Sequence, residues 1–454
     1  MESIFDIPAD LDTPVSAFLR LSSLRPRYLL ESVEGGHTGR YSFIGFGDTE
    51  TVTIDDDGVN ANGVSLGTDL LTGLREALRR APVCAAEDKA SPFDGGLVGV
   101  SALDLVRRLY RLPPSPHPDS GPDGVYITTS SILVFDHLTR RMALLHSGGE
   151  EERRQLRGQV QSALRGALTH VTTPAGHQAA SPSMSRDEYL GGVESVKRHI
   201  EAGDVYQLVL SIRFTGETGV DPFAAYRALR LLNPSPYMYF IDTGDRQVVG
   251  SSPEALARLK GTKAELRPIA GTRPRGSDED EDHRLERELL ADPKEAAEHV
   301  MLVDLARNDV GRTALPGTVV VEPFRTIERY SHVMHMVSGV TADLRPELDA
   351  FDLFAATFPA GTVTGAPKLR AIEIIDELEP VSRGLYSGSI GYFGHGGSMD
   401  QAITIRTMVF ENGGYSYQAG AGIVADSDPA TEHHEVLSKA AVLEAALQMA
   451  KEGL

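Results

Sequence analysis

The spacing of apolar and polar residues divides the first third of the chain into short helices and strands. Apolar residues recur at helical spacing, which predicts helices over 13–22, 68–80 and 151–167. Short β-rich runs predict strands over 28–31, 41–45, 51–54, 95–100 and 142–146. The run 125–136 predicts one further strand, joined to the strand at 142–146 by the polar turn HLTRR.

The same two periodicities continue, more sharply, in the rest of the chain. Ser185 is a predicted N-cap for a helix ending near residue 202, and Asp428-Pro429 opens a long final helix. Helices are also predicted over 222–231 and 366–378, and strands over 205–214, 237–242, 247–250, 318–322, 325–340, 387–393, 402–410 and 415–419. Helices and strands do not alternate regularly, so we expect an α+β fold and not a doubly wound one.

One stretch has the composition of a linker. Residues 169–185, THVTTPAGHQAASPSMS, are rich in Thr, Ala, Ser and Pro, which favours loop structure. They predict an N-terminal region over 1–168 and a C-terminal region over 186–454. The acidic run 278–282 reads either as a metal site or as a solvated loop, and we expect the loop because like charges favour exposure.

The predicted helix over 293–309 carries two carboxylates on one face. Glu295 and Glu298 are three residues apart, and Glu432 and Glu435 repeat this spacing on the final helix. Four carboxylates from two helices can hold one hard cation. Such pairs also occur on solvated helix faces, so the spacing alone leaves both interpretations open.

Three glycine-rich stretches are candidates for binding an anion through backbone amides. They are 268–275, 358–368 and the segment Gly420-Ala-Gly-Ile-Val that follows a predicted strand. Each one alone is consistent with an ordinary loop. Together with Arg406, inside a predicted strand, and Glu254, after a Ser-Ser-Pro turn, they indicate a small polyanionic ligand, because a buried arginine needs a partner.

Composition narrows the classes of function. With 44 basic and 64 acidic residues the net charge is −20, which argues against binding nucleic acid or an anionic membrane. Cys84 is the only cysteine, so no disulfide framework and no thiolate metal cluster are expected. The first residues lack the apolar core of a signal peptide, and no apolar run is long enough to span a membrane. We expect a cytoplasmic protein.

Many runs along the chain match those of one known enzyme family. The chain resembles the chorismate-utilising enzymes, and among them the large subunits of anthranilate synthases. The matching runs are LLESVEGG (29–36), GRYSFIGF (39–46), GDVYQLVLS (203–211), NPSPYMYF (233–240), SSPEALARL (251–259), PIAGTRPRG (268–276), KEAAEHVMLVDLARNDVG (294–311), SHVMHMVSGV (331–340), FPAGTVTGAPKLRAIEIIDELEP (358–380), GSIGYFG (388–394), AITIRTMV (402–409) and QAGAGIVADSDP (418–429). The resemblance implies two large, mostly antiparallel β-sheets packed as a sandwich with helices outside.

The resemblance also implies roles for the residues that bind metal and substrate. Mg²⁺ would be held by Glu295, Glu298 and Glu435 with Glu432 beside them, and would bind the ring carboxylate of chorismate. The amides of Gly420, Ala421 and Gly422, with Lys439 nearby, would bind the same carboxylate. The enolpyruvyl carboxylate would be bound by Tyr386 and Arg406, and the ring would be lined by Gly271, Thr272 and Thr362.

For catalysis the resemblance implies a general acid and a nucleophile. Glu254 would protonate the departing C4 hydroxyl, so burial must raise its pKa. His335 is the second acid/base candidate, near C2 and C3, although a core histidine on a strand is a competing interpretation. Relatives that add water at C2 carry a lysine base where this chain has Gln207. An amide is not a base at neutral pH, so Gln207, counted with Thr362 among the catalytic candidates, favours ammonia.

Product and partners follow from the same resemblance. Ala270 stands where many enzymes that aminate at C4 have a lysine, so amination at C2 and pyruvate loss to anthranilate are expected. The alternatives are a 2-amino-2-deoxyisochorismate synthase, which retains the pyruvate, an aminodeoxychorismate synthase, and a catalytically silent regulatory subunit. Cys84 lies in no nucleophile elbow, so ammonia would come from a separate glutamine amidotransferase subunit or from free ammonium. A tryptophan feedback pocket would be formed by Leu30, Glu31, Ser32, Pro234, Tyr237 and Met238.

Overall fold

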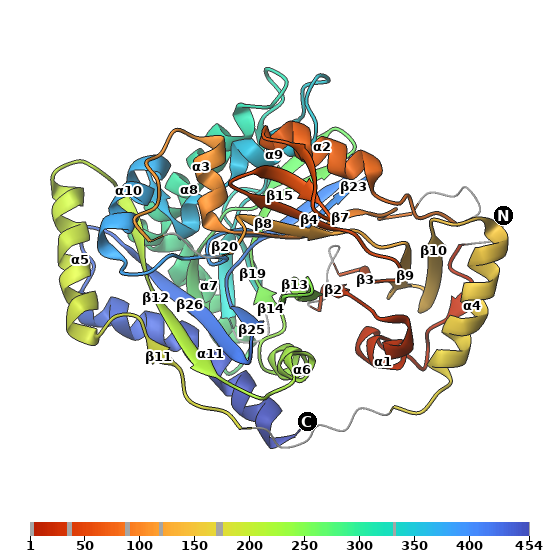
Figure 1. Cartoon of the computed structure of the whole chain (residues 1–454). Coiled ribbons are helices and arrows are strands. Elements are labelled where there is room, and N and C mark those ends of the chain that lie inside the picture. Colours follow the sequence, from red (N-terminus) through yellow and green to blue (C-terminus); the bar gives the residue numbers. More distant parts are fainter. Residues whose placement is uncertain are drawn as a thin grey trace.

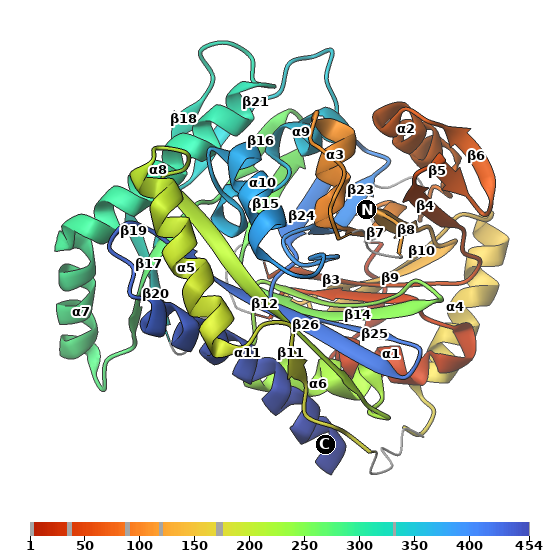
Figure 2. The ribbon, with the colours of Figure 1, turned by 60° about the vertical axis from the view of Figure 1, so that its left-hand side comes forward.

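The computed structural model describes residues 4–33, 39–86, 91–117, 121–168, 176–329 and 333–453. In these residues two large antiparallel sheets, of 12 and 11 strands, pack face to face, and a separate sheet of 3 strands lies at one side. Figures 1 and 2 show the two large sheets as layers with helices on their outer faces. The predicted α+β class, with two large antiparallel sheets and helices outside, is confirmed.

The 12-stranded sheet joins strands from both ends of the chain. In spatial order it contains β1 (Ile7–Pro8), β10 (Arg141–His146), β9 (Ser131–Asp136), β3 (Tyr41–Phe46), β2 (Tyr28–Glu31), β13 (Tyr237–Asp242), β14 (Arg246–Ser252), β25 (Thr407–Glu411), β26 (Gly414–Ile423), β12 (Gln207–Glu217) and β11 (Ser181–Pro182), and β22 (Gly365–Ala366) also pairs with β12. The pairing of β2 with β13 unites the N-terminal and C-terminal regions in this sheet.

The 11-stranded sheet also contains strands from both the N-terminal and the C-terminal region. Its order is β18 (Val320–Val321), β21 (Val340–Asp343), β16 (Lys263–Leu266), β15 (Ala255–Lys260), β24 (Met399–Ile403), β23 (Ser389–Gly394), β7 (Gly96–Ser101), β8 (Gly124–Ile127), β4 (Thr51–Asp55), β5 (Gly58–Ala61) and β6 (Val64–Gly67). The third sheet has the order β17 (Ile269–Pro274), β20 (Val333–Val337) and β19 (Thr326–Arg329). Both regions of the chain therefore share both large sheets.

Helices cover the outer faces and close the hydrophobic cores. Beside the 12-stranded sheet are α1 (Pro14–Arg20), α4 (Glu150–Leu164), α5 (Arg186–Glu201), α6 (Pro222–Leu232) and α11 (Pro429–Glu452). Beside the 11-stranded sheet are α2 (Leu70–Arg80), α3 (Val106–Leu109), α8 (Pro293–Gly311) and α9 (Ala350–Thr357), and α7 (Glu279–Ala291) packs on the third sheet. α10 (Lys368–Leu378) packs on β12 and β22 of the 12-stranded sheet. The predicted helix starts Ser185 and Asp428, and also Asp292 before α8, each accept a hydrogen bond from the first turn of their helix.

Two predicted strands are in fact two strands each, because the chain crosses from one large sheet to the other. The run 125–136 is β8 in the 11-stranded sheet and then β9 in the 12-stranded sheet. The run 402–410 is β24 and then β25, with the crossing at 404–406. Arg406, predicted inside a strand, lies at this crossing with φ 49°. The crossing residues 128–130 and 404–406 are mostly polar, but both runs are rich in β-forming residues on either side of them, so the pattern alone predicts one continuous strand.

Four other segments differ from the structure that their sequence predicts. The acidic run 278–282 is not a loop: Asp278 caps α7 and the next four residues form its first turn, where negative charge is favourable beside the positive end of the helix dipole. Gly420, Ala421 and Gly422 lie within β26 and not after a strand. The extended stretch 325–340 is divided among β19, β20 and β21. Of the predicted linker, residues 169–175 lie outside the described residues, and Ser181–Pro182 forms β11.

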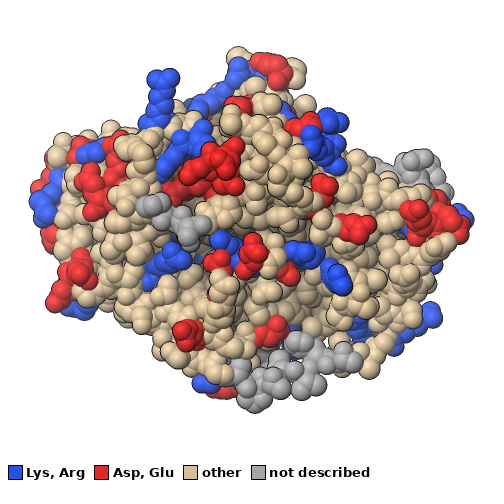
Figure 3. Space-filling model, viewed as in Figure 1, with Lys and Arg blue, Asp and Glu red and all other residues tan. Residues whose placement is uncertain are grey.

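Charge is mixed over the surface and is not collected in one region of the visible face. Figure 3 shows acidic and basic side chains interspersed there. Among the described helices, none is long and apolar enough to pass through a membrane.

A buried ion pair links the sheet edge to the segment after α10. Arg383 and Glu379 have side chains 2% and 3% exposed, with Nη2 and Oε1 2.6 Å apart. Arg383 also donates to the carbonyls of Val209 and Val363, at 2.7 Å and 2.8 Å. Glu379 accepts from the backbone N–H of Ser211 at 2.8 Å. The pair, which follows α10, therefore binds both β12 and the loop after α9 that contains Val363.

We expect Arg383→Met to lower the free energy of unfolding by about 3–5 kcal/mol, because it leaves Glu379 as a buried, uncompensated charge. Arg79→Met, which breaks the exposed Arg79–Glu76 pair, is the control and should cost about 0–1 kcal/mol. Urea unfolding monitored by circular dichroism measures both. Equal losses in the two variants would contradict the structural role of the buried pair.

Candidate active site

A cavity of about 410 Å³ opens between the two large sheets and the third sheet. Residues far apart in the sequence meet there, and nine of them were predicted as binding or catalytic residues. The predicted residues that line it are Glu254, Thr272, His335, Thr362, Tyr386, Arg406, Gly420, Gly422 and Lys439. The structure therefore brings together the predicted acid, the predicted second acid/base and the predicted anion-binding groups.

Glu254 and Arg406 are placed by two neighbouring crossings between the sheets. β14 passes into β15 through Pro253 and Glu254, and β24 passes back into β25 through 404–406. The crossings are hydrogen bonded to each other: the N–H of Ile403 donates to the carbonyl of Glu254 at 3.0 Å, and that of Ser251 to Arg406 at 3.1 Å. Arg406 also donates through Nη1 to the side chain of Asn233 at 3.1 Å.

The environment of Glu254 favours its neutral form. Burial raises the pKa of this carboxyl to about 7, although the hydroxyl of Thr362 and the positive charges of Lys439 and Arg406 act in the opposite direction. Removing a carboxylate from water costs more than these partners return. At neutral pH a large fraction of Glu254 therefore holds a proton that it can donate.

His335 lies opposite the crossings, on the third sheet. It pairs with Thr272 across β20 and β17, and its Nδ1 is 2.9 Å from the Thr272 hydroxyl. Burial and the charge of Arg406 lower the pKa of His335, opposed by a hydrogen bond with the backbone of Gly271. The imidazole is therefore mostly neutral at pH 7 and can accept a proton.

Gly271 itself lies behind the cavity wall. It forms the irregularity in the β17–β20 pairing, with φ 76°. A Cβ atom there would come within 3.1 Å of a Glu295 oxygen and 2.9 Å of Leu289. Its role in the structure is to let β17 approach α7 and α8.

The glycine-rich part of β26 presents two amides, and not three, to the cavity. The N–H groups of Ser211 and Val209 point away from β26, to Glu379 and Thr364, so their partners Gly420 and Gly422 form the non-hydrogen-bonded pairs of this ladder. The amides of these glycines face the open edge, where Lys439 donates to the Gly420 carbonyl at 2.9 Å. Ala421 instead pairs with Leu210, and its side chain lies in the core.

Tyr386 and Gln207 lie against these glycines. A Cβ atom on Gly420 would be 2.7 Å from the Tyr386 hydroxyl, and one on Gly422 would be 2.7 Å from Nε2 of Gln207. The Arg383 guanidinium lies 5.4 Å from the centre of the Tyr386 ring. Burial raises the pKa of Tyr386, so its hydroxyl stays protonated and can donate to an anion.

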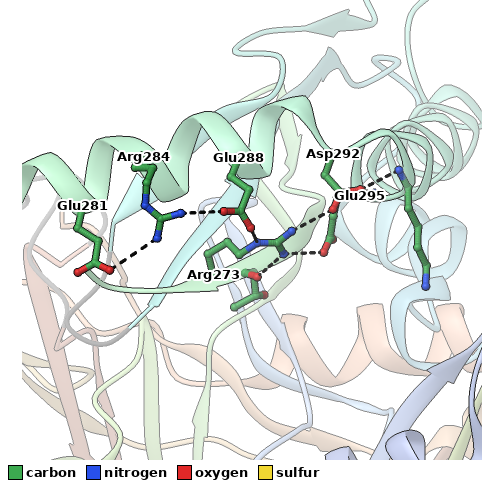
Figure 4. Close-up of polar contacts among 8 residues, drawn as sticks. Arg273, Glu281, Arg284, Glu288, Asp292 and Glu295 are labelled. Atoms are coloured by element: carbon green, nitrogen blue, oxygen red, sulfur yellow. Dashed lines mark hydrogen bonds and ion pairs between the residues drawn. The ribbon is translucent and has the colours of Figure 1, made fainter. Parts of the chain in front are cut away.

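The four acidic metal candidates lie on α8 and α11, beyond the cavity lining. Glu295 pairs with Arg273 at 2.9 Å, and Arg273 also contacts Asp292 and Glu288 (Figure 4). Glu435 pairs with Lys439 at 2.7 Å. Arg273 was not predicted as the partner of Glu295, because it comes from β17, far from α8 in sequence.

The other two acidic candidates, Glu298 and Glu432, both have raised pKa values. Burial raises the pKa of Glu298, and the charges of Glu295, Glu435 and Glu432 add to this effect. Burial and Glu435 also raise the pKa of Glu432, while a hydrogen bond with Ser427 opposes them. In the described part of the chain no group of three such side chains is gathered closely enough to hold a metal ion. The donors are nevertheless oxygen ligands under mutual repulsion, which suits a hard dication.

The predicted feedback residues line a second, smaller cavity. Its volume is about 150 Å³, and Leu30, Glu31, Ser32, Tyr237 and Met238 contribute to its wall. Pro234 lies in the wall of the 410 Å³ cavity instead, and Pro236 borders both. The loop between α6 and β13 thus separates the two cavities.

Sequence reasoning missed several residues of the site. Asn233 and Gln418 also line the large cavity, and Arg383 holds Tyr386 and the β12 edge in place. The alternation along β26 was a signal for Gln418, because it shares a face with Gly420 and Gly422. Cys84 is buried, and burial raises its pKa to about 12, so it is no nucleophile.

Glu254→Gln is expected to stabilise the fold in a pH-dependent way. Glu254 has a folded pKa of about 7 against an ordinary value of 4.5, so the folded state loses stability as pH rises from 4.5 through 7. The variant removes this penalty and should gain about 3 kcal/mol at pH 8, but little at pH 4.5. Urea unfolding at both pH values measures it, with the exposed Glu217→Gln as control. A gain independent of pH would contradict the prediction.

Comparison with known proteins identifies the family to which the chain belongs. A profile of the family described as chorismate binding enzyme matches residues 25–445. Anthranilate synthase component 1 of Thermus thermophilus is 47% identical over 98% of this chain and 97% of its own length. That of Pseudomonas aeruginosa is 44% identical over 99% and 96%.

Solved structures of similar fold include one protein with the same name as these relatives. Anthranilate synthase component I of Streptococcus pneumoniae has a TM-score of 0.79 and 34% identity, over 98% of this chain and 100% of that one. The menaquinone-specific isochorismate synthase of Escherichia coli, at 19% identity and a TM-score of 0.72, over 96% of this chain and 92% of that one, shares the fold. The chain therefore belongs to the chorismate binding enzymes, and within them to the group of proteins named anthranilate synthase component 1.

Proposed function

We propose that this enzyme converts chorismate and ammonia to anthranilate, pyruvate and water. The observation that carries the proposal is the single cavity in which a protonated Glu254, a neutral His335 and Arg406 meet. The names of the relatives support the product, and Gln207 supports ammonia in place of water as the nucleophile.

Binding uses groups at two sides of the cavity. Arg406 and Tyr386 donate to the enolpyruvyl carboxylate, since a guanidinium and a protonated phenol both suit an anion. The open amides of Gly420 and Gly422, with Lys439, face the ring carboxylate. Chorismate is then oriented between the crossings and the third sheet, with its ring against Thr272 and Thr362.

The first step replaces the C4 hydroxyl by an amine at C2. Ammonia forms a bond to C2, the ring double bonds shift, and the C4–O bond breaks. Glu254 donates its proton to the departing oxygen, which leaves as water. The raised pKa of Glu254 makes it an effective donor near neutral pH.

The second step releases pyruvate and forms the aromatic ring. The C3–O bond breaks, the proton on C2 is removed, and the released enolpyruvate becomes pyruvate. His335 accepts this proton, because it is neutral and its orientation is set by Thr272. Retention of pyruvate would instead make this a 2-amino-2-deoxyisochorismate synthase.

We also propose that Glu295, Glu298, Glu432 and Glu435 hold Mg²⁺. The raised pKa values of Glu298 and Glu432 support this, because burial and repulsion between the carboxylates raise them, and a bound dication would offset both. When bound, the ion supplies positive charge for the ring carboxylate. Ammonia would come from a glutamine amidotransferase subunit, as the name component 1 suggests for its relatives, and tryptophan would occupy the 150 Å³ cavity as a feedback inhibitor.

The direct test is a product assay with chorismate, Mg²⁺ and ammonium chloride. We expect blue-fluorescent anthranilate and an equal amount of pyruvate, detected with lactate dehydrogenase and NADH. An aminated product with no pyruvate would identify the 2-amino-2-deoxyisochorismate synthase. No amination at all would overturn the proposed function.

Glu298→Gln should weaken Mg²⁺ binding by at least about tenfold, the loss seen when even an outer-shell partner is removed. The rise in melting temperature with added MgCl₂ at pH 8 measures binding without turnover. Asp304→Asn, an exposed position of the same helix, is the control and should respond as the unaltered chain does. An unchanged MgCl₂ response in Glu298→Gln would remove Glu298 from the metal site.

A further inference from the structure

One guanidinium group lies where the third sheet meets the start of α8. Arg273, on β17, donates through Nη1 to Oε1 of Glu295 at 2.9 Å and through Nη2 to Asp292 at 3.0 Å. Its Nε donates to Glu288 of α7 at 3.3 Å. Figure 4 shows the guanidinium between these three carboxylates. Arg273 therefore joins β17 to both α7 and α8.

The contact between Arg273 and Glu295 is the shortest of the three and is partly sheltered from water. The two side chains are 19% and 23% exposed, whereas that of Glu288 is 50% exposed. The hydrogen bond with Glu295 is also the largest of the causes that raise the pKa of Arg273. A charge-assisted hydrogen bond of this kind holds the carboxylate in one orientation.

The ion pair turns Glu295 toward β17. Its Oε1 is held by the guanidinium, and a Cβ atom on Gly271 would come within 3.1 Å of its Oε2. Burial raises the pKa of Glu298, and the charges of Glu435 and Glu432 add to this effect, so Glu298 lies near α11. Among the described residues no three acidic side chains are gathered closely enough to hold an ion. Glu295 must therefore turn from β17 before it can share an ion with Glu298.

Arg273 can release Glu295 without becoming an uncompensated charge. Asp292 and Glu288 remain within hydrogen-bond reach, and Nη1 also donates to the Thr272 carbonyl at 3.0 Å. Asp292 is itself fixed, because its other oxygen accepts from the first amides of α8. The exchange leaves the guanidinium paired, while Glu295 gains a partner of twice the charge.

We propose that Arg273 competes with Mg²⁺ for Glu295 and thereby sets how tightly α8 and α11 bind the ion. The inference rests on the proposed function, in which Glu295 is one of the oxygen ligands. At low Mg²⁺ concentration Glu295 stays on the guanidinium, and at higher concentration it is transferred to the ion. Because the same guanidinium holds the Thr272 carbonyl, the exchange occurs beside the strand that lines the large cavity. Arg273 is a positioning residue that acts through Glu295.

Arg273→Gln tests the competition, because it removes the charge and keeps a polar side chain. We expect about fivefold tighter Mg²⁺ binding, since a partly exposed ion pair no longer has to be broken. The rise in melting temperature over a series of MgCl₂ concentrations at constant ionic strength measures binding without turnover. Arg284→Gln is the matched control, because it removes the same charge from contacts with Glu281 and Glu288 of α7. It should change Mg²⁺ binding by less than about twofold.

A double-mutant cycle shows whether Arg273 acts through Glu295. Mg²⁺ binding is weaker in Glu295→Gln, and adding Arg273→Gln should then change it by less than about twofold. Glu288→Gln, at an exposed position where folding is not at risk, removes another partner of the guanidinium. It should strengthen the hold on Glu295 and weaken Mg²⁺ binding by about twofold.

The outcomes separate this inference from the proposed function. Unchanged or weaker Mg²⁺ binding in Arg273→Gln overturns the competition alone, as do equal gains in Arg273→Gln and Arg284→Gln. A full gain from Arg273→Gln in the Glu295→Gln background also overturns it, because the effect then does not pass through Glu295. If MgCl₂ does not raise the melting temperature of the unaltered chain, the proposed metal site fails, and the competition with it.

Discussion

The active site depends on a two-stranded ribbon that crosses from one large sheet to the other. β14 and β25 are neighbours in the first sheet, and their continuations β15 and β24 are neighbours in the second. Hydrogen bonds hold the crossings together, from Ser251 to Arg406 and from Ile403 to Glu254. An acid and an arginine are thereby fixed side by side in the space between the sheets.

That position explains the chemistry of Glu254. Between the sheets the cost of burying its charge outweighs the attraction of Arg406 and Lys439, and the carboxyl stays largely protonated near neutral pH. The same burial keeps Tyr386 protonated and His335 neutral. One physical cause therefore prepares a proton donor, an anion-binding hydroxyl and a proton acceptor.

Much of this could be predicted from the sequence. Helix caps such as Ser185 and Asp428 are local signals, and the fold class and nine residues of the cavity wall followed from motifs. The crossings at 128–130 and 404–406 could not be predicted, because a short polar stretch inside a β-rich run such as 402–410 does not show that the chain changes sheets. The pairing of Arg273 with Glu295, and the third sheet that carries His335, depend on contacts between distant segments, which alternation does not encode.

The most direct test of the account is the pH dependence of kcat/KM for chorismate, which reports the free enzyme. If Glu254 is the proton donor, kcat/KM falls as pH rises through about 7. Thr362→Val removes a hydroxyl that lowers the pKa of Glu254, so in this variant the fall should move to higher pH. A fall at the same pH in both proteins, or none between pH 6 and about 8.5, would contradict the assignment of Glu254.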